Sequence, residues 1–371
     1  MRENMRIHGD ALTDIGLRRA VNEDAVLTGG SIFAVADGMG GHEAGDLASR
    51  LCIQTLADIA VNLTDSDTDR LPHAREVLTQ VERADVAIRS AIGARGGTTL
   101  CALALIRAEP GGGNWPGASP EATPRSNPAA TPMAHPEANT QEFSAKSFTA
   151  QQRNPENDLR RVDPRAGEDF TSPSGIFLGA LNSAVSRTPE PTTDVLPYVP
   201  ATPEAAAASN PVLAEDLAQP VYLDTSEAHE QLQLMLVNVG DSRGYRLRDG
   251  VLTQLTLDHS AVQELIDAGS ITEAEARVHP QRNLITRALG AGGNSVPDAQ
   301  FHALVPGDRY LLCSDGLTGE VEHERIQEIL NGSAERGVAL KQLVEAALAS
   351  GGRDNISVLI IDVSDDAVQV H

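Results

Sequence analysis

Apolar runs of strand length recur near both ends of the chain, and an aspartate stands beside each of four of them. The runs at 32–36, 234–239 and 310–313 lead to Asp37, Asp241 and Asp315, and the run at 356–361 follows Asp354. Continuous apolar runs bounded by turn residues indicate buried strands. Irregular or helical sequence lies beyond each aspartate, so we expect the four carboxylates to gather at one edge of a β core.

Asp249-Gly250 shows the contrasting pattern. Only these two residues separate the strand patterns at 245–247 and 251–252. Asp-Gly in such a place is typical of a two-residue hairpin turn, so we assign it no chemistry.

Helical periodicity fills much of the rest of the two ends. The pattern predicts helices over 43–63, 74–92 and 260–269, a short helix with Thr272 as its N-cap, one or two helices over 326–348, and further strands over 98–106 and from Ile356.

The periodicity disappears between residues 109 and 228, where most of the 21 prolines fall among Ala, Thr, Ser, Asn and Gly. Such a segment cannot bury enough apolar surface to offset its chain entropy, so we predict a largely disordered insert. A domain tolerates a long insert because the cost of loop closure rises slowly with length. The predicted organisation is one discontinuous domain over 7–108 and 229–363, the insert at 109–228, and a tail at 364–371.

The formal net charge of −23 argues against nucleic acid and against an anionic membrane surface, because both require basic patches. Cys52, Cys101 and Cys313 are widely spaced within apolar stretches, which predicts buried thiols in a reducing compartment. No apolar run approaches ~18 residues and the N-terminus lacks a signal-peptide core, so we expect a cytoplasmic protein without a membrane segment.

The acidic balance fits a metal site, since bound divalent cations would invert the local field for an anionic substrate. Carboxylate oxygens are the ligands that hard cations prefer. Glycines beside Asp37 open the backbone to a close neighbour. The four aspartates together therefore favour one metal site over four ordinary turns.

Seven sequence blocks occur in order along the chain. They are TDIG through Arg19 to NED at 13–24, DGMGGHEAG at 37–45, GGTTL at 96–100, VGDSRGYRLRDG at 239–250, the block at 258–290, SDGLTGEV at 314–321 and GGRDNISVLIIDV at 351–363. In this order they resemble the bacterial form of the type 2C (PPM) family of metal-dependent serine/threonine protein phosphatases. The resemblance covers 7–108 and 229–363.

The resemblance implies an α+β fold, an antiparallel β-sandwich flanked by helices (α-β-β-α), with the active site at one end. It implies that Asp37 bridges two Mn²⁺ or Mg²⁺ ions, that Asp315 and Asp354 hold the first, and that the Gly38 carbonyl holds the second. Asp241, with Asp315, matches the carboxylates of a third, weaker ion. Mg²⁺ keeps several waters, which agrees with few protein ligands for each ion.

Other residues receive roles from the same resemblance. Glu23 and Asp24 match positions that hold metal-bound waters, and Arg19 matches the phosphate-binding arginine. A guanidinium grips two phosphate oxygens at once. An extended backbone points the side chain of the neighbouring Arg18 to the opposite face. A water between two ions would attack phosphorus in line with the departing serine or threonine oxygen.

The general acid is left open. Some relatives carry a histidine two residues after the bridging aspartate, but Met39 stands there and cannot donate a proton. His42 is a candidate catalytic acid and equally a residue that only begins a helix, and metal-bound water is a further alternative. The block at 258–290 matches a mobile flap, with Asp258, His259, Ser260 and Arg287 as its candidate site residues.

The expected partners are phosphoserine and phosphothreonine proteins, including a serine/threonine kinase, acted on by a monomer. One alternative is a phosphatase dedicated to a single regulatory phosphoprotein in a partner-switching circuit. Another is a non-catalytic binding module that uses the insert, although Asp37, Asp315 and Asp354 are all retained. A metal-dependent nuclease is disfavoured by the absence of a basic track.

Overall fold

The computed structural model describes residues 4–40, 42–61, 70–93, 95–108, 118–119, 221–224 and 232–365. All of them belong to one compact unit, formed by 1–126 and 201–371. A second unit, 127–200, lies outside the described residues. The predicted insert therefore lies outside them too, except for two short strands.

Two sheets form the centre of the described unit. The six-stranded sheet has the order β10-β9-β12-β13-β1-β7 and the seven-stranded sheet the order β2-β3-β5-β8-β11-β6, with β4 beside β3. The strands of the first are β10 (Val251–Gln254), β9 (Arg243–Arg248), β12 (Arg309–Cys313), β13 (Ile356–Asp365), β1 (Asn4–Asp14) and β7 (Val221–Asp224). Those of the second are β2 (Asp24–Leu27), β3 (Ile32–Met39), β4 (Gly97–Thr98), β5 (Leu100–Arg107), β8 (Leu232–Val239), β11 (Asp298–His302) and β6 (Ala118–Ser119).

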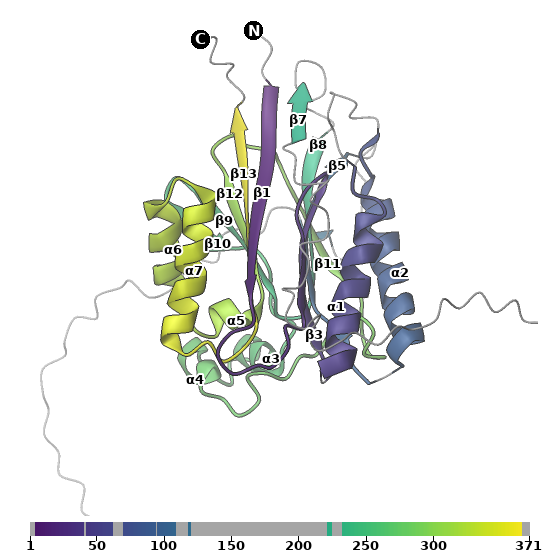
Figure 1. The fold of residues 1–371 in the computed structure, drawn as a ribbon, viewed down its shortest axis with the longest axis vertical. Helices are drawn as coiled ribbons and strands as arrows, with labels where there is room; N and C mark the ends of the chain where they lie inside the picture. Colours follow the sequence, from purple (N-terminus) through teal and green to yellow (C-terminus); the bar gives the residue numbers. More distant parts are fainter. Residues whose placement is uncertain are drawn as a thin grey trace, which may run out of the picture. The chain divides into compact units, whose positions relative to one another are not determined.

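Helices cover the outer faces of both sheets (Figure 1). The pair α1 (His42–Ala57) and α2 (Ala74–Ile92) packs on the seven-stranded sheet, and α6 (His323–Gly332) and α7 (Arg336–Ser350) pack on the six-stranded one. The remaining helices are α3 (Ala261–Asp267), α4 (Glu273–Arg277) and α5 (Asp315–Thr318). The predicted α-β-β-α sandwich is confirmed.

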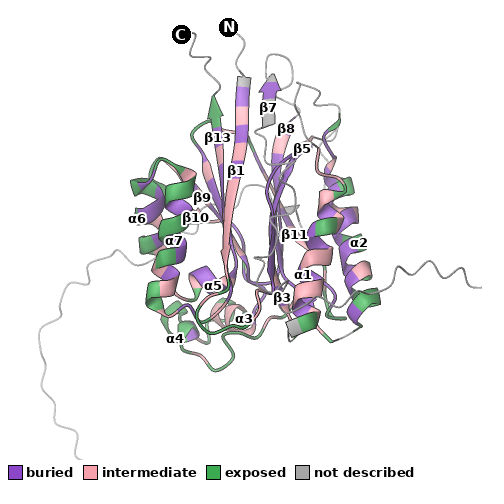
Figure 2. Ribbon diagram, in the orientation of Figure 1, coloured by how far each residue is buried: buried purple, intermediate pink, exposed green. Residues whose placement is uncertain are grey.

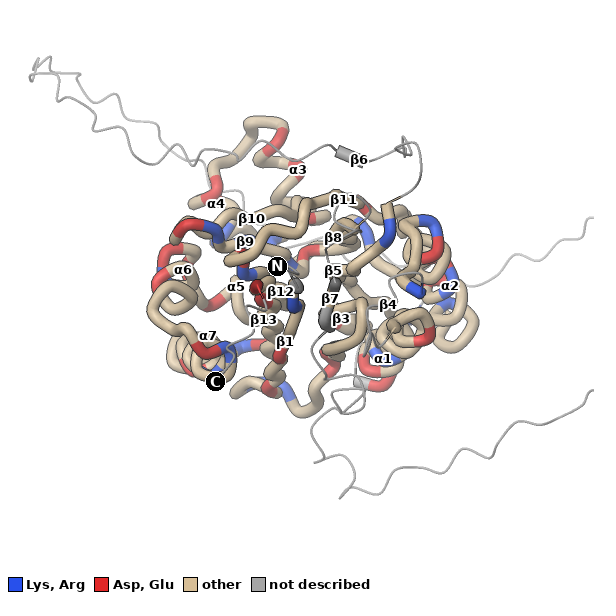
Figure 3. The backbone as a smooth tube through the Cα atoms, turned by 90° about the horizontal axis from the view of Figure 1, so that it is seen from above, with Lys and Arg blue, Asp and Glu red and all other residues tan. Residues whose placement is uncertain are grey.

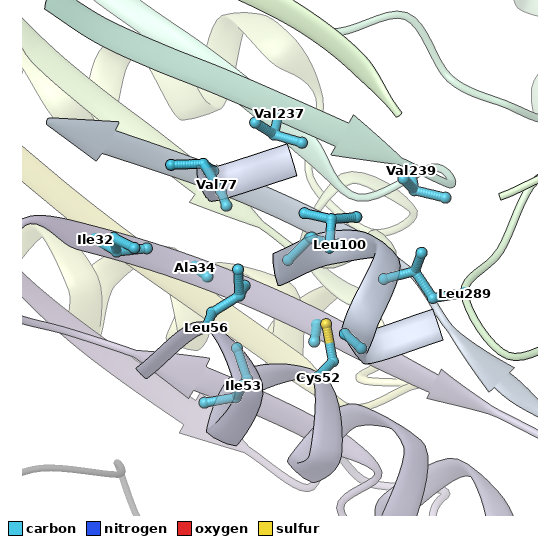
Figure 4. Close-up of a cluster of buried hydrophobic side chains, with 14 of the residues drawn as sticks. Ile32, Ala34, Cys52, Ile53, Leu56, Val77, Leu100, Val237, Val239 and Leu289 are labelled. Carbon is cyan, nitrogen blue, oxygen red and sulfur yellow. The ribbon is translucent and has the colours of Figure 1, made fainter. Parts of the chain in front are cut away.

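Three apolar layers hold this arrangement together. Phe33 and Tyr310 belong to the layer between the sheets, where they are 2% and 0% exposed. Figure 4 shows the layer beneath α1 and α2, in which Leu56 and Val77 meet residues of β3 and β8. Figure 2 shows the same division, with buried strands between helices whose outer faces are exposed. Burying each large side chain contributes about 1.5–3 kcal/mol.

Most predicted elements are present with small differences in extent. The hairpin turn is confirmed: Val251 pairs with Arg248, and both Asp249 and Gly250 have positive φ, 52° and 80°. Thr272 caps α4: its hydroxyl accepts from the Glu275 N–H, and its own N–H donates to the Glu275 carboxylate. The helix predicted over 43–63 ends at Ala57, where the backbone enters a turn.

Two details of the prediction were wrong. The strand predicted over 98–106 is interrupted at Thr99, between β4 and β5, where the Asp37 N–H donates to the hydroxyl of Thr99. The insert was predicted to extend to residue 228, yet β7 at 221–224 already pairs with β1. Its Leu223 is 0% exposed. A four-residue strand inside a proline-rich stretch has too little periodicity to be seen in the sequence.

Candidate active site

Asp37 lies near the end of β3, and neighbouring strands fix its backbone. Its N–H donates to Thr99 Oγ1 at 3.0 Å, and its carbonyl accepts from the Thr99 N–H and the Thr98 hydroxyl, both at 2.9 Å. Antiparallel pairing of β2 with β3 sets Asp24 opposite Asp37. The first carboxylate of the site therefore stands on a rigid strand, with a second beside it.

Gly38 lies where three backbone segments meet. A Cβ at this position would lie 2.2 Å from the carbonyl oxygen of Gly45 and 2.6 Å from that of Glu23, so no side chain fits. The Gly38 N–H donates to the Glu23 carbonyl at 3.2 Å, and the Ser49 hydroxyl donates to the same carbonyl at 2.6 Å. Glu23 itself is 6% exposed. The glycine thus allows β2, β3 and α1 to pack closely beside Asp37.

Two further aspartates come from the six-stranded sheet. Asp315 is the first residue of α5, directly after β12, and Asp354 stands just before β13. Ser314 links the two sheets, because its hydroxyl donates to Asp24 Oδ2 at 2.8 Å. The site is therefore assembled across the sandwich rather than on one sheet.

Asp241 follows β8 through Gly240, whose φ of 104° turns the chain. Asp241 is 7% exposed, and its buried Oδ1 has no hydrogen-bond partner within the described part of the chain. A buried carboxylate oxygen without a donor is costly unless a cation or water meets it.

Burial and mutual repulsion make ionisation of these carboxyls unfavourable. Burial, and then the neighbouring Asp24 and Asp315, raise the pKa of Asp37 well above its usual value. Burial and Asp315 do the same to the pKa of Asp241. Burial and the charge of Asp354 raise the pKa of Asp315 to about 6, and burial raises the pKa of Asp24 to about 7. These repulsions act between neighbouring carboxyls, so the aspartates predicted from the sequence lie close to one another.

These residues fit a hard divalent cation. Their metal-binding atoms are oxygens, their negative charge is concentrated, and the buried Oδ1 of Asp241 has no hydrogen-bond donor among the described residues. Among the described His, Cys, Asp and Glu side chains, no group of three or more is placed so that it could hold a metal ion by itself. Backbone carbonyl and water ligands would be needed as well, as Mg²⁺ and Mn²⁺ commonly require.

Arg19 lies in the loop between β1 and β2 and reaches the acidic site. Its Nη2 donates to Asp354 Oδ2 at 2.6 Å, and about half of the guanidinium side chain remains exposed. The exposed Arg18 beside it has no such contact to the site. The structure thus places Arg19 against the acidic site, although Arg18 lies in a turn and not in the extended backbone assumed in the prediction.

His42, the candidate general acid, is the first residue of α1, and its side chain lies outside the described residues. Met39 ends β3.

The flap begins with Asp258 and His259, whose side chains bind the residues on either side of Asp241. Arg243 makes a bidentate ion pair with Asp258, with Nη2–Oδ2 at 2.6 Å and Nε–Oδ1 at 2.9 Å. The Gly240 N–H donates to His259 Nδ1 at 3.0 Å. His259 Nε2 lies 3.0 Å from Asp298 Oδ2, and because Nδ1 is an acceptor, Nε2 carries the proton and donates.

Two more flap residues, Ser260 and Arg287, add contacts near the start of the flap. Ser260 caps α3 by accepting from the Gln263 N–H at 3.3 Å. Arg287 donates to Asp298 Oδ1 at 2.8 Å. The hydrogen bond from His259 is the largest effect that lowers the pKa of Asp298. At the outer side, Arg277 of α4 forms an ion pair with Glu322, the N-cap of α6.

Sequence reasoning missed several residues that support the site. Thr99 and Ser242 join the two strand ends through their hydroxyls at 2.7 Å, and Asn355, Asp298 and Arg243 make the contacts described here and below. The only available signal was a polar residue at the end of an apolar run, which a turn explains equally well. Their partners are distant in sequence, so spacing alone does not reveal them.

Figure 3 shows Lys and Arg positions interspersed with Asp and Glu over the described helices and loops, without a continuous basic track. The three cysteines are free and buried, and burial raises the pKa of Cys52 and Cys313 to about 12. Within the described residues, every helix is too short or too polar to cross a membrane.

Comparison with known proteins gives clear relatives, although no family model matches the chain. The serine/threonine protein phosphatase PstP of Mycobacterium tuberculosis is 33% identical over 356 residues, which are 96% of this chain and 45% of PstP. The serine/threonine phosphatase stp of Listeria monocytogenes is 42% identical over 132 residues, 36% of this chain and 52% of stp. The chain thus spans about half the length of the curated relatives it matches.

Solved structures agree with these relatives. A crystal structure of the M. tuberculosis phosphatase PstP/Ppp superposes with a TM-score of 0.58 at 28% identity, covering 97% of this chain and 99% of that one. The catalytic domain of PstP in complex with two manganese ions gives a TM-score of 0.54 at 27% identity, covering 97% of this chain and 100% of that one.

Proposed function

The chain belongs to the bacterial type 2C (PPM) family of metal-dependent serine/threonine protein phosphatases, and on that premise we propose that it hydrolyses phosphoserine and phosphothreonine in proteins. The observation that carries the proposal is the convergence of Asp24, Asp37, Asp241, Asp315 and Asp354 at one end of the sandwich. Nothing in the fold requires five acids to share one place. Their repulsion opposes folding, so a function that needs cations accounts for them best.

We propose that Asp37 contacts two divalent cations, Asp315 and Asp354 the first, and the Gly38 carbonyl the second. Asp241 with Asp315 would hold a third, weaker ion. The PstP catalytic domain in complex with two manganese ions supports the metal dependence, and Mn²⁺ is therefore the first cation to test. When bound, such cations neutralise the acidic site for an anionic substrate and acidify the attacking water.

The chain's own residues would then bind and orient the phosphoryl group. Arg19 is the nearest cation of the β1–β2 loop, and a guanidinium matches the geometry of two phosphate oxygens. Arg19 pairs with Asp354 in this structure, so we propose that Arg19 exchanges this partner for phosphate. Glu23 and Asp24, near Asp37, would orient water by accepting hydrogen bonds from it. His42 remains our candidate for protonating the departing serine or threonine oxygen.

The wider context belongs to the same proposal. We propose a cytoplasmic monomer that opposes serine/threonine kinases, with the flap that starts at Asp258 controlling access of the phosphoprotein. The names of the relatives support phosphoprotein substrates. Free, buried thiols accord with a reducing compartment.

Phosphate release from a phosphothreonine peptide tests the activity directly. We expect turnover with Mn²⁺ or Mg²⁺ and none in excess EDTA. Asp315→Asn should nearly abolish turnover while leaving the circular dichroism spectrum unchanged, and Glu345→Gln on the exposed face of α7 serves as the charge-matched control. Turnover of the wild type that persists in excess chelator would refute the metal-dependent mechanism.

A further inference from the structure

The loop that carries Arg19 is held against one short segment of the chain, residues 352–355. The Leu17 N–H donates to the Gly352 carbonyl at 2.7 Å. Gly16, with φ of 75°, lies so close that a Cβ would be 2.1 Å from the carbonyl oxygen of Asp354. The Arg19 guanidinium itself ends on the Asp354 carboxylate. The position of the arginine thus depends on a segment more than three hundred residues away in the sequence.

The side chain of Asn355 makes the central contacts between the two. Its Nδ2 donates to the carbonyls of Ile15 and Val21, each at 3.0 Å, and its Oδ1 accepts from the Glu23 N–H at 2.9 Å. Asn355 is 3% exposed. Both N–H bonds and the carbonyl oxygen of the amide are therefore used. The two accepting carbonyls flank Arg19, one on each side, so a single amide closes the base of the loop.

The preceding residue, Asp354, strengthens the arrangement. The Asn355 N–H donates to Asp354 Oδ1 at 2.9 Å, while Arg19 donates to Asp354 Oδ2 at 2.6 Å. Asn355 therefore fixes the loop by its side chain and the carboxylate opposite Arg19 by its backbone. An asparagine suits this place because only an amide offers two donors and an acceptor in one plane.

We propose that Asn355 is a positioning residue that holds the loop 15–21 so that Arg19 is presented at the acidic site. The part of this inference that concerns substrate rests on the proposed phosphatase function. Asn355 touches neither substrate nor reacting atoms, and it acts through Arg19. Replacing it with alanine leaves the carbonyls of Ile15 and Val21 and the Glu23 N–H without their donor or acceptor, and the loop is released.

A double-mutant cycle tests whether Asn355 acts through Arg19. Asn355→Ala should raise the KM for a phosphothreonine peptide at least about tenfold, since small displacements of a substrate-orienting group carry large kinetic costs. In the Arg19→Ala background the same substitution should raise KM less than about twofold, because the group that it positions is already gone. Equal effects of Asn355→Ala in both backgrounds would overturn the inference.

Gln80→Ala is the matched control. Gln80 is also 3% exposed, and its amide also joins two elements, donating to the Thr55 carbonyl of α1 at 2.7 Å. It lies on α2 and outside the site. Its substitution should combine additively with Arg19→Ala. A non-additive result for Gln80→Ala as well would show that the coupling is a general loss of stability and would contradict the inference.

Trypsin provides a measurement that does not depend on activity. It cleaves after arginine, and Arg18 and Arg19 both stand in the exposed loop. In metal-free protein, Asn355→Ala should speed cleavage at this loop at least about tenfold relative to wild type, and Gln80→Ala should not. If the wild type releases no phosphate, the proposed function fails, and the cleavage rates still decide whether Asn355 holds the loop.

If Asn355→Ala does not fold, Asn355→Asp provides a second test. Asn355→Asp keeps the size of the side chain and the acceptor for Glu23, but it sets a carboxylate against the carbonyls of Ile15 and Val21. It should release the loop to the same protease. In the wild type, the Glu23 amide should exchange slowly with deuterium, and exchange at the rate of an open loop would overturn the assignment by itself.

Discussion

At the scale of single residues, the site depends on distinctions that chemical type does not reveal. Arg18 and Arg19 are the same amino acid at adjacent positions, yet only Arg19 reaches the carboxylate of Asp354. Asp241 and Asp249 both follow a strand, yet Asp241 is buried with a carboxylate oxygen that lacks a partner and Asp249 forms a hairpin turn. Burial and neighbours, rather than side-chain identity, decide which residues carry chemistry.

The two arginines give the first prediction at this scale. Arg19→Ala should lower kcat/KM for a phosphopeptide. The loss of transition-state stabilisation should be roughly 2–3 kcal/mol, as expected when a charge-assisted contact to phosphate is removed. Arg18→Ala should change it less than threefold. Steady-state kinetics with Mn²⁺ on both variants measure the difference, and similar losses in the two would show that the assignment between these neighbours is wrong.

The buried carboxyls give the second. The folded pKa values of Asp24, about 7, and Asp315, about 6, lie above the value near 4 that aspartate has in an unfolded chain. The metal-free folded state therefore binds more protons than the unfolded state between pH 4 and 7, so its free energy of unfolding should fall as the pH rises through that window. Saturating Mn²⁺ should remove most of this fall, because a cation stabilises the ionised carboxylates.

Urea unfolding in EDTA between pH 4.5 and 7.5 measures the effect. Asp315→Asn should make the free energy of unfolding fall less steeply with pH, because it removes one of the carboxyls whose pKa is raised in the folded state. Each pKa unit of difference between the folded and unfolded states contributes on the order of 1.4 kcal/mol. Glu345→Gln removes a charge from the exposed face of α7 and should leave the slope unchanged. A metal-free protein whose stability rises with pH would contradict the electrostatic account of the site.

At the scale of elements, the flap is anchored to the turn that bears Asp241. Asp258 binds Arg243 on one side of that turn, and His259 accepts from Gly240 on the other. The capping box of α4 and the helix cap of Ser260 are local signals that the sequence displays. The anchor is not local, because Asp298 approaches His259 from β11.

This anchor leads to a prediction for the flap. His259→Ala leaves the Gly240 N–H without its acceptor and removes the donor to Asp298, which should cost about 1–3 kcal/mol of stability. Hydrogen exchange over residues 258–287 should accelerate relative to the sandwich strands. Arg325→Ala, which removes an exposed ion pair with Glu328, is the control and should leave exchange unchanged. Uniform acceleration across all strands would mean that His259 stabilises the fold rather than the flap.

The sequence allows the local elements and the identity of the acids to be predicted, since both follow from short patterns. The Asp249-Gly250 turn and the N-cap at Thr272 need only their immediate neighbours. The break at Thr99 depends on Asp37, and the role of Asn355 depends on Ile15, Val21 and Glu23. These contacts join residues tens to hundreds of positions apart, so only the folded chain reveals them.

At the scale of the whole molecule, the site connects the two sheets. Asp24, Asp37 and Asp241 stand on strands of the seven-stranded sheet or directly after one, and Asp315 and Asp354 flank strands of the six-stranded sheet. A cation shared by Asp37 and Asp315 would therefore tie the two halves of the sandwich together. The long segment between β5 and β8 is attached elsewhere, and its deletion provides a test at this scale.

Two deletions distinguish the segment from its flanking strands. Removing 120–220 through a short Gly-Ser linker keeps β6 and β7, and activity on p-nitrophenyl phosphate should stay within a few-fold of wild type. Removing 109–228 also deletes β7 with its buried Leu223, so this variant should melt at a lower temperature because the edge of β1 is uncovered. Thermal melts and initial rates compare them, and loss of activity in the folded 120–220 deletion would mean that the segment helps to build the site.

The strands run between two ends of the described unit, the acidic end and an opposite end, and the two ends differ in how readily added sequence is tolerated. Leu100 of β5 and Val239 of β8 are paired at the acidic end, and Arg107 and Leu232 are paired at the other. Met5 pairs with Asp365 at that second end, so the described limits of β1 and β13 meet there as well (Figure 1). Eight-residue strands span roughly 23 Å, at ~3.3 Å per residue. Sequence added at this end is attached about that far from the acidic site, so evolution can append tethers and recruitment modules there without changing the site. A reporter protein fused at the same end should leave phosphate release unchanged.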